Sequence, residues 1–235
     1  MSGSEERPLA AALDHWRDVT RALGPGHPNW PGDTPLTLTA TASKAAGDSV
    51  NVMALTTSTH LGTHLDAPYH YDECGGRLEV VPLRDLLGPC LVLDVRDDGA
   101  PAGAPVTAES ALAALERVSA RRPHARARIL LRSGQPDAWS AFPIGFRPLS
   151  EALVEALAHR GARLLGTDAP SVDAFTSKTL PVHASCAREG VWIVEGLALA
   201  AIEEGAYELV CLPLRLIGAD ASPVRALLRP LAASS

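Results

Sequence analysis

A series of short apolar segments is the feature that most constrains how this chain can fold. Segments this short are typical of strands buried in a sheet, because a buried helix of ordinary length needs a longer apolar stretch. They cover residues 90–95, 129–132, 163–166, 191–195 and 207–212. Residues 36–41 and 51–57 are rich in Thr, Val and Leu and partly alternate, so we predict strands there too.

Two other segments have the pattern of amphipathic helices. Thr107 can cap one helix, which would run to about residue 120. Ser150 can cap the second helix, and Gly161 suits its C-terminal end. Strands that alternate with helices favour an α/β domain built on a mixed sheet.

The bulk composition is that of a globular protein and excludes several classes. The chain has 235 residues, of which 46% are hydrophobic and 20% charged, with a formal net charge of -6. We expect a flexible lead-in over residues 1–15 and one domain over 16–235, with a second small lobe left open.

The excess of acidic residues and the absence of a basic stripe in the sequence argue against a nucleic-acid partner. No apolar run reaches the roughly 18 residues of a membrane span. The polar N-terminus lacks the layout of a signal peptide, so we expect a cytoplasmic protein.

The four cysteines lie far apart and contain no C-x-x-C pair. In a reducing cytoplasm this spacing favours free thiols. Cys186 follows His183 by three residues, so a role as a metal ligand or nucleophile is a less favoured alternative.

The densest group of potential metal ligands lies in residues 60–70, His-Leu-Gly-Thr-His-Leu-Asp-Ala-Pro-Tyr-His. It contains His60, His64, Asp66 and His70. Imidazole and carboxylate are the ligands that zinc prefers, and Mn or Fe also accept them. A single histidine is usually structural, but three with a carboxylate at this density predict a metal site.

The backbone of this segment is predicted to be extended or turning rather than helical. Gly62 lies between the first two histidines, and Pro68 disfavours a helical conformation in the residue before it. In an extended chain, side chains two residues apart share a face, so His64 and Asp66 would point the same way. We therefore predict a loop that wraps a metal, fed by a strand that ends near residue 59.

A second polar stretch follows one predicted strand and leads into another. It contains Asp168, Asp173, Lys178 and His183, and Glu195 ends the next apolar strand. A carboxylate in that position is costly unless it is paired or bound to metal. For Glu195 a metal ligand and a solvent-facing strand end are equally favoured. For Asp168, Asp173 and Lys178, ordinary polar groups of a loop are favoured over supports of the site, and their roles stay open.

Trp30 lies in a segment with three prolines and a glycine, residues 28–35, which predicts a rigid turn. From these residues alone, a Trp that packs over the edge of the core is the favoured interpretation.

Taken together, these residues make the chain resemble the cyclase family of metal-dependent hydrolases, and most closely its bacterial kynurenine formamidase (arylformamidase) branch. The family signature H-x-G-T-H-x-D-x-P-x-H is met in full by residues 60–70. The similarity covers most of the chain. It includes Trp-Pro-Gly-Asp at 30–33, residues 168–178, His183, Glu-Gly at 195–196, and residues 212–225.

The resemblance implies a two-zinc site, with Mn or another divalent metal as an alternative. His60, His64 and Asp66 would hold the first ion. Asp66 would also reach a second ion, which His183 would ligate, and Glu195 would bridge both. The remaining roles implied are an acid/base residue, His70, and a residue that contacts the aromatic substrate, Trp30. The family fold is a mixed, barrel-like β-sheet flanked by helices, of the swivelling β/β/α type, usually in a homodimer.

The activity implied is hydrolysis of N-formyl-L-kynurenine to L-kynurenine and formate, in tryptophan degradation by the kynurenine route. One alternative is another hydrolase of the family that opens a cyclic amide such as isatin. An alternative from another class is a metal-dependent protein that binds a small molecule without turnover. His70 argues against it, because this histidine is surplus to the ligand set.

Overall fold

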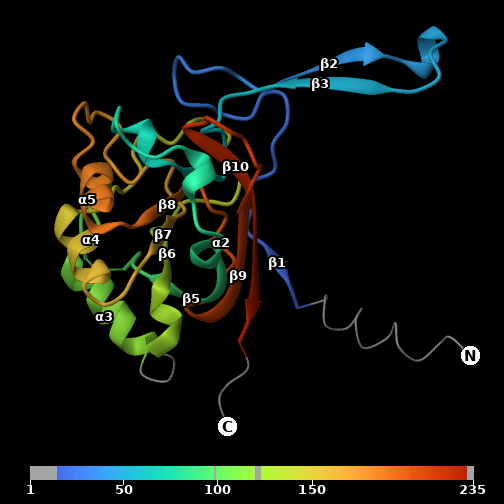
Figure 1. Ribbon diagram of the computed structural model, residues 1–235. Coiled ribbons are helices and arrows are strands. Elements are labelled where there is room, and N and C mark those ends of the chain that lie inside the picture. The colour runs from blue at the N-terminus through green and yellow to red at the C-terminus, as the bar shows by residue number, and fades with distance from the viewer. Residues whose placement is uncertain (1–14, 98, 120–122, 232–235) are drawn as a thin grey trace, which may run out of the picture.

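The main sheet of the protein closes on itself to form a barrel (Figure 1). The computed structural model describes residues 15–97, 99–119 and 123–231, so the predicted lead-in falls almost wholly outside the described residues. Within these ranges, the strands are β1 (Arg17–Asp18), β2 (Thr37–Ala42), β3 (Val52–Thr56), β4 (His64–Asp66), β5 (Leu87–Asp94), β6 (Arg128–Arg132), β7 (Leu164–Thr167), β8 (Trp192–Glu195), β9 (Gly205–Pro213) and β10 (Ala221–Pro230).

The barrel follows the strand order β10-β4-β8-β7-β6-β5-β9, and β9 pairs with β10 to complete the circle. Strands β5 to β8 are mutually parallel, and the remaining pairs are antiparallel. Strand β1 adds to β10 outside the closed set. The predicted fold, a mixed and barrel-like sheet in an α/β domain, is confirmed.

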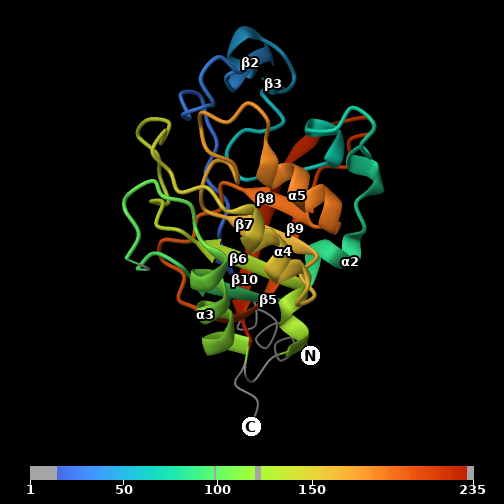
Figure 2. The same cartoon turned by 90° about the vertical axis from the view of Figure 1, so that its left-hand side faces the viewer.

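Helices cover the outer face of the parallel strands (Figures 1 and 2). They are α3 (Ala108–Ser119), α4 (Glu151–Ala158) and α5 (Pro181–Glu189), and a short α2 (Leu83–Leu86) lies at the start of β5. Single 3-10 turns complete the structure at Lys44–Ala46, Pro68–His70, Leu78–Val80 and Pro123–Ala127. The predicted caps are present, since Thr107 accepts from the Ser110 amide and Ser150 from the Leu153 amide.

Alternate residues of the strands serve two separate cores. In β5, Cys90 and Val92 face a cluster inside the barrel, where β9 and β10 also contribute. Leu91 and Leu93 face the opposite way and pack against α3, α4 and α5. Both faces of the parallel strands are therefore apolar, which is why these segments appear in the sequence as continuous short apolar runs.

Five of the described strands and helices were not predicted: β1, β4, β10, α2 and α5. Strand β4 has three residues, two of them polar, and α5 carries polar residues on several sides, so neither has a clear apolar period. The prediction for the strand that leads into the histidine-rich segment, residues 60–70, was also wrong. This strand ends at Thr56 rather than near residue 59, and it belongs to a separate hairpin instead of the main sheet.

This hairpin, β2 and β3 with the turn between them (residues 37–56), projects from the body, and we call it the arm (Figure 1). The register pairs Leu38 with Leu55 and Ala40 with Met53, so these four side chains share one face. The other face is mostly Thr. All four apolar side chains are exposed.

Among the residues that the structure describes, no helix has the length and hydropathy needed to cross a membrane.

Candidate active site

Strand pairing brings the predicted ligands together at one end of the barrel. β4 begins with His64 and ends with Asp66, and its register against β8 sets His64 opposite Glu195. His60 lies in the turn that precedes β4, and α5 presents His183 from the outer layer. His64, Asp66, His183 and Glu195 are all buried.

Two glycines allow the turn before β4 and the end of β8 to approach so closely. Gly196, directly after Glu195, has a positive φ of 67°, and a Cβ there would overlap the carbonyl oxygen of Gly62. Gly62 also has a positive φ, of 66°. Thr63 stabilises this close contact, because its Oγ1 donates a hydrogen bond to the Gly196 carbonyl oxygen at 2.6 Å. The glycines in these positions are therefore required by the geometry of the site.

The ligand atoms form two groups that share Asp66. One comprises His60, His64 and Asp66, and the other Asp66, His183 and Glu195. The His60 Nδ1 and His64 Nε2 atoms lie 3.1 and 3.4 Å from Asp66 Oδ1. The His183 Nε2 atom lies 3.5 Å both from Asp66 Oδ2 and from Glu195 Oε1. The second Glu195 oxygen is 3.3 Å from His64 Nε2.

In each of the three imidazoles, one ring nitrogen, the inner one, faces the carboxylates of the ligand groups. The other ring nitrogen, the outer one, contacts a different group. The outer Nε2 of His60 pairs with Asp220 Oδ2 at 3.0 Å, and the outer Nδ1 of His183 pairs with Asp173 Oδ2 at 2.7 Å. The outer Nδ1 of His64 lies 3.1 Å from the Gly62 carbonyl oxygen. Partners of this kind fix the tautomer and orientation of metal-binding histidines.

The inner atoms fit a cation. Both Asp66 oxygens and the His64 Nε2 atom are buried and lack a hydrogen-bond partner among the described residues. Leaving a buried carboxylate without hydrogen bonds is costly, and a metal ion satisfies such atoms directly. Nitrogen and carboxylate donors in groups of three are the ligand sets of catalytic zinc and related ions.

The electrostatics of the ligand groups also favour a positive charge beside the carboxylates. Burial by itself opposes charge on Asp66, but nearby His64, His183 and His60 lower its pKa well below the ordinary value. Burial likewise opposes charge on His60 and His183, yet the neighbouring carboxylates raise the pKa of each to about 10. A bound cation would meet the same electrostatic demand.

His70 lies beside the ligand groups on the 3-10 turn Pro68–His70. Its ring centroid is 4.0 Å from that of His60 and 5.7 Å from that of His183. It lines the cavity above the ligands. Burial lowers the pKa of His70, the charge of Asp66 opposes this shift, and the charges of His60 and His183 add to it. A third possible ligand group joins His70 with His60 and Asp220, but it draws on the same His60.

A cavity of about 280 Å³ opens over the ligands and is walled by aromatic rings. Trp30, which the family resemblance implies would contact the substrate, lines this cavity, and its ring centroid lies 5.1 Å from those of Phe142 and Phe175. Trp139 also lines the cavity. Phe142, Phe175 and Trp139 were not predicted from the sequence, because each is an aromatic residue in a loop without any sequence pattern around it.

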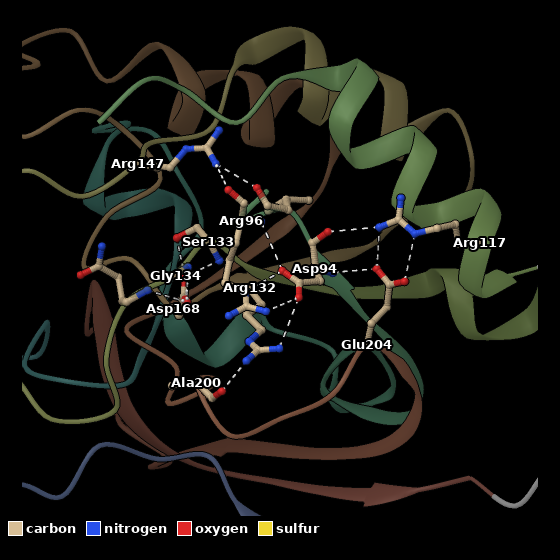
Figure 3. A network of polar contacts seen from close by, with 12 residues as sticks. Asp94, Arg96, Arg117, Arg132, Ser133, Gly134, Arg147, Asp168, Ala200 and Glu204 are labelled. Carbon is tan, nitrogen blue, oxygen red and sulfur yellow. Dashed lines mark hydrogen bonds and ion pairs between the residues drawn. The ribbon is translucent and has the colours of Figure 1, made fainter. Parts of the chain in front are cut away.

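The residues whose roles stayed open now have positions. Asp168 is buried and accepts hydrogen bonds from Ser133 and from the backbone amides of Gly134 and Gln135 (Figure 3). Asp173 holds His183, as described above. Lys178 is exposed and does not line the cavity. Cys186 is buried in α5, where burial raises the pKa of its thiol, and it belongs to none of the ligand groups.

The chain belongs to the cyclase family: the family's sequence model matches residues 17–174. Within that family it is similar to a kynurenine formamidase of Geobacillus thermodenitrificans (strain NG80-2). The two are 37% identical over 219 residues, which is 93% of this chain and 99% of the relative.

Solved structures agree with this classification. One from Bacillus stearothermophilus, described as a predicted metal-dependent hydrolase, is 28% identical, with a TM-score of 0.70 over 91% of this chain and 97% of that one. Isatin hydrolase A from Labrenzia aggregata superposes with a TM-score of 0.80 over 97% of this chain and 100% of that one. At 22% identity, the second likeness establishes the fold alone.

Proposed function

We propose that this protein is a metal-dependent amidohydrolase that converts N-formyl-L-kynurenine to L-kynurenine and formate, a step of tryptophan breakdown. The observation that carries the proposal is the pair of ligand groups sharing Asp66 beneath an aromatic cavity. The kynurenine formamidase relative, 37% identical over nearly its whole length, supports this substrate.

The proposed ligands are those predicted from the sequence. His60, His64 and Asp66 would hold one ion, and Asp66, His183 and Glu195 a second, with zinc as the expected metal and Mn as an alternative. When bound, the metal supplies an acidified water as nucleophile and positive charge for the oxyanion.

The chain's own residues would then position the substrate and move the proton. The rings of Trp30 and its neighbours would stack on the aromatic ring of the substrate and keep water away from the formyl group. His70, at the cavity wall, would donate a proton to the departing aniline nitrogen. General-acid help of this kind is typically worth about 10²- to 10⁴-fold in rate.

The direct test is hydrolysis of N-formylkynurenine, followed at the absorbance of kynurenine, by wild-type protein with and without a chelator. We expect turnover that the chelator abolishes and added zinc restores. His70→Ala should lower kcat by about 10²-fold or more while the metal content stays unchanged. His159→Ala is the matched control, because His159 is exposed and belongs neither to the cavity lining nor to the ligand groups.

Two alternatives are outcomes of the same test. A zinc-loaded protein that leaves N-formylkynurenine intact but opens isatin would be a cyclic-amide hydrolase, an option compatible with the shared fold. A protein that binds metal and hydrolyses neither compound, nor other formamides, esters and lactams, would be a metal-dependent binding protein.

We further propose that the enzyme acts in the cytoplasm as a homodimer. The exposed apolar face of the arm supports association, because a two-stranded ribbon is only marginally stable alone. The cysteines are free, which suits a reducing compartment.

A further inference from the structure

One wall of the aromatic cavity is a segment without helix or strand, residues 133–142, which we call the wall segment. It carries Trp139 and Phe142, both of which line the cavity. An irregular segment has no ladder of backbone hydrogen bonds to hold its shape, so its side chains stay in place only if other groups bind its backbone.

The first of these groups is Asp168, at the start of the wall segment. Its carboxylate accepts from the backbone amides of Ser133, Gly134 and Gln135, at 2.9, 3.0 and 3.0 Å (Figure 3). This anchor holds the start of the wall segment, and it lies before the aromatic residues. Further along, the Asp137 carboxylate accepts from the Ala200 amide at 2.8 Å.

Arg21 provides the anchor for the middle of the wall segment. Its side chain is 2% exposed and donates from one nitrogen to the carbonyl oxygens of Pro136 and Asp137, at 2.7 and 2.9 Å. The other terminal nitrogen donates to the carbonyl oxygens of Asp168 and Leu197, at 2.9 and 3.0 Å. One planar guanidinium thus joins the wall segment to the ends of β7 and β8, next to the ligand cluster.

The same guanidinium also contacts the aromatic wall itself. Its central carbon lies 3.8 Å from the ring centroid of Trp139, the distance of a cation–π contact. None of the four hydrogen bonds involves a predicted metal ligand. The charge therefore acts on the wall of the cavity rather than on the metal cluster.

We propose that Arg21 is a positioning residue for substrate recognition: it holds Trp139 and the wall segment against the aromatic ring of the substrate. The statement that the substrate is aromatic rests on the proposed function. Lysine cannot replace Arg21, because a single ammonium lacks the planar fork that reaches carbonyls on two sides.

The test compares Arg21→Lys with a matched control, Arg128→Lys. Arg128 is also largely buried and also donates to backbone carbonyls, those of Arg84, Asp85 and Pro89, but it does not line the cavity. The readouts are the Kd of acetanilide by calorimetry, KM and kcat for N-formylkynurenine, bound metal, and Tm. Acetanilide carries the aryl amide without an amino-acid group, and calorimetry measures its binding directly, so this readout does not require turnover of N-formylkynurenine.

For Arg21→Lys we expect Kd and KM to rise by at least about tenfold, with kcat within about threefold and bound metal unchanged. Arg128→Lys should lower Tm without changing Kd or KM. Should Arg21→Lys fail to fold, Trp139→Leu keeps all four backbone anchors and should weaken acetanilide binding to a similar degree.

The proposal is overturned if folded Arg21→Lys binds acetanilide as the wild type does, or if both variants weaken binding equally. Loss of metal in parallel with binding would also overturn it, because Arg21 would then support the whole site. If the wild type binds acetanilide but does not hydrolyse N-formylkynurenine, the proposed function fails while the binding comparison still decides the role of Arg21.

Discussion

The three predicted metal-binding histidines of the candidate site, His60, His64 and His183, differ in what contacts their outer nitrogens. His60 and His183 are paired with carboxylates, Asp220 and Asp173, whereas His64 faces a backbone carbonyl. A carboxylate partner makes the imidazole a stronger electron donor as well as orienting it. Side-chain replacement can therefore test two of the three contacts directly.

Asp173→Asn should lower metal affinity by about 10- to 100-fold, because the amide keeps the shape of the carboxylate but not its charge. Competition with a chromophoric chelator measures this. Asp72→Asn, at an exposed carboxylate beyond the ligand groups, serves as the control and should have no effect. Equal affinity in the Asp173 variant and the wild type would show that the contact to His183 does not matter for metal binding.

Gly196→Ala should destabilise the protein by more than the cost of its backbone conformation alone. The added Cβ would overlap the Gly62 carbonyl and push the His60–His64 turn away from Glu195. Gly190 offers a matched control, since its φ of 64° is similar and nothing lies within 4 Å of an added Cβ. Urea unfolding should show a loss of about 1 kcal/mol for Gly190→Ala and clearly more for Gly196→Ala. Equal losses would contradict the close approach.

At the scale of elements, the sequence predicted best where apolar period and capping agree. The parallel strands and helices α3 and α4 lie where their apolar runs and the caps Thr107 and Ser150 placed them. Helix α5 was missed because its apolar residues are few, and β10 because Pro223 and Arg225 interrupt the apolar pattern. Both elements owe their conformation to tertiary contacts.

The same limit applies to the candidate site. The motif at residues 60–70 predicted which side chains would cluster, since its ligands are close in sequence. Asp220 and Arg21 could not be predicted, because their partners lie more than 100 residues away along the chain. Their roles depend on which loops the closed barrel brings together.

The arm makes an element-scale prediction about association. Met53→Asp and Leu55→Asp place charge on its apolar face, so we expect either change to convert a dimer to a monomer in size-exclusion chromatography with light scattering. Ala54→Asp puts the same charge on the Thr face and should leave the dimer intact. A wild-type protein that is monomeric at all concentrations would refute the proposed homodimer.

For the whole molecule, charged side chains link separate elements at the carboxyl ends of the parallel strands (Figure 3). Asp94 of β5 accepts from Arg96 at 2.9 and 2.7 Å and contacts Arg132 of β6 at 3.3 Å. Glu204, just before β9, accepts from Arg117 of α3. These contacts tie strands, helix and loop together at one end of the barrel.

This network predicts how stability depends on pH. Hydrogen bonds from Arg96 and the charge of Arg132 lower the pKa of Asp94 from 3.8. The carboxylate thus stabilises the folded state above that value, and the contribution is lost as pH falls through the lower folded pKa. Asp94→Asn should lower the free energy of unfolding by about 1 kcal/mol at pH 7, and the difference should shrink progressively as pH falls below 3.8. Urea titrations at several pH values measure this, with Asp97→Asn as control, and a constant difference across pH would contradict it.

Strand β10 closes the barrel although it follows every other strand along the chain. While the ribosome is still making residues 221–230, β4 can pair only with β8, and the edges of β4 and β9 stay open. Asp220, which orients His60, also emerges only shortly before that strand. During synthesis, the ligands on β4, β8 and α5 can therefore come together before β10 exists, whereas the Asp220 contact that orients His60 forms only near the end.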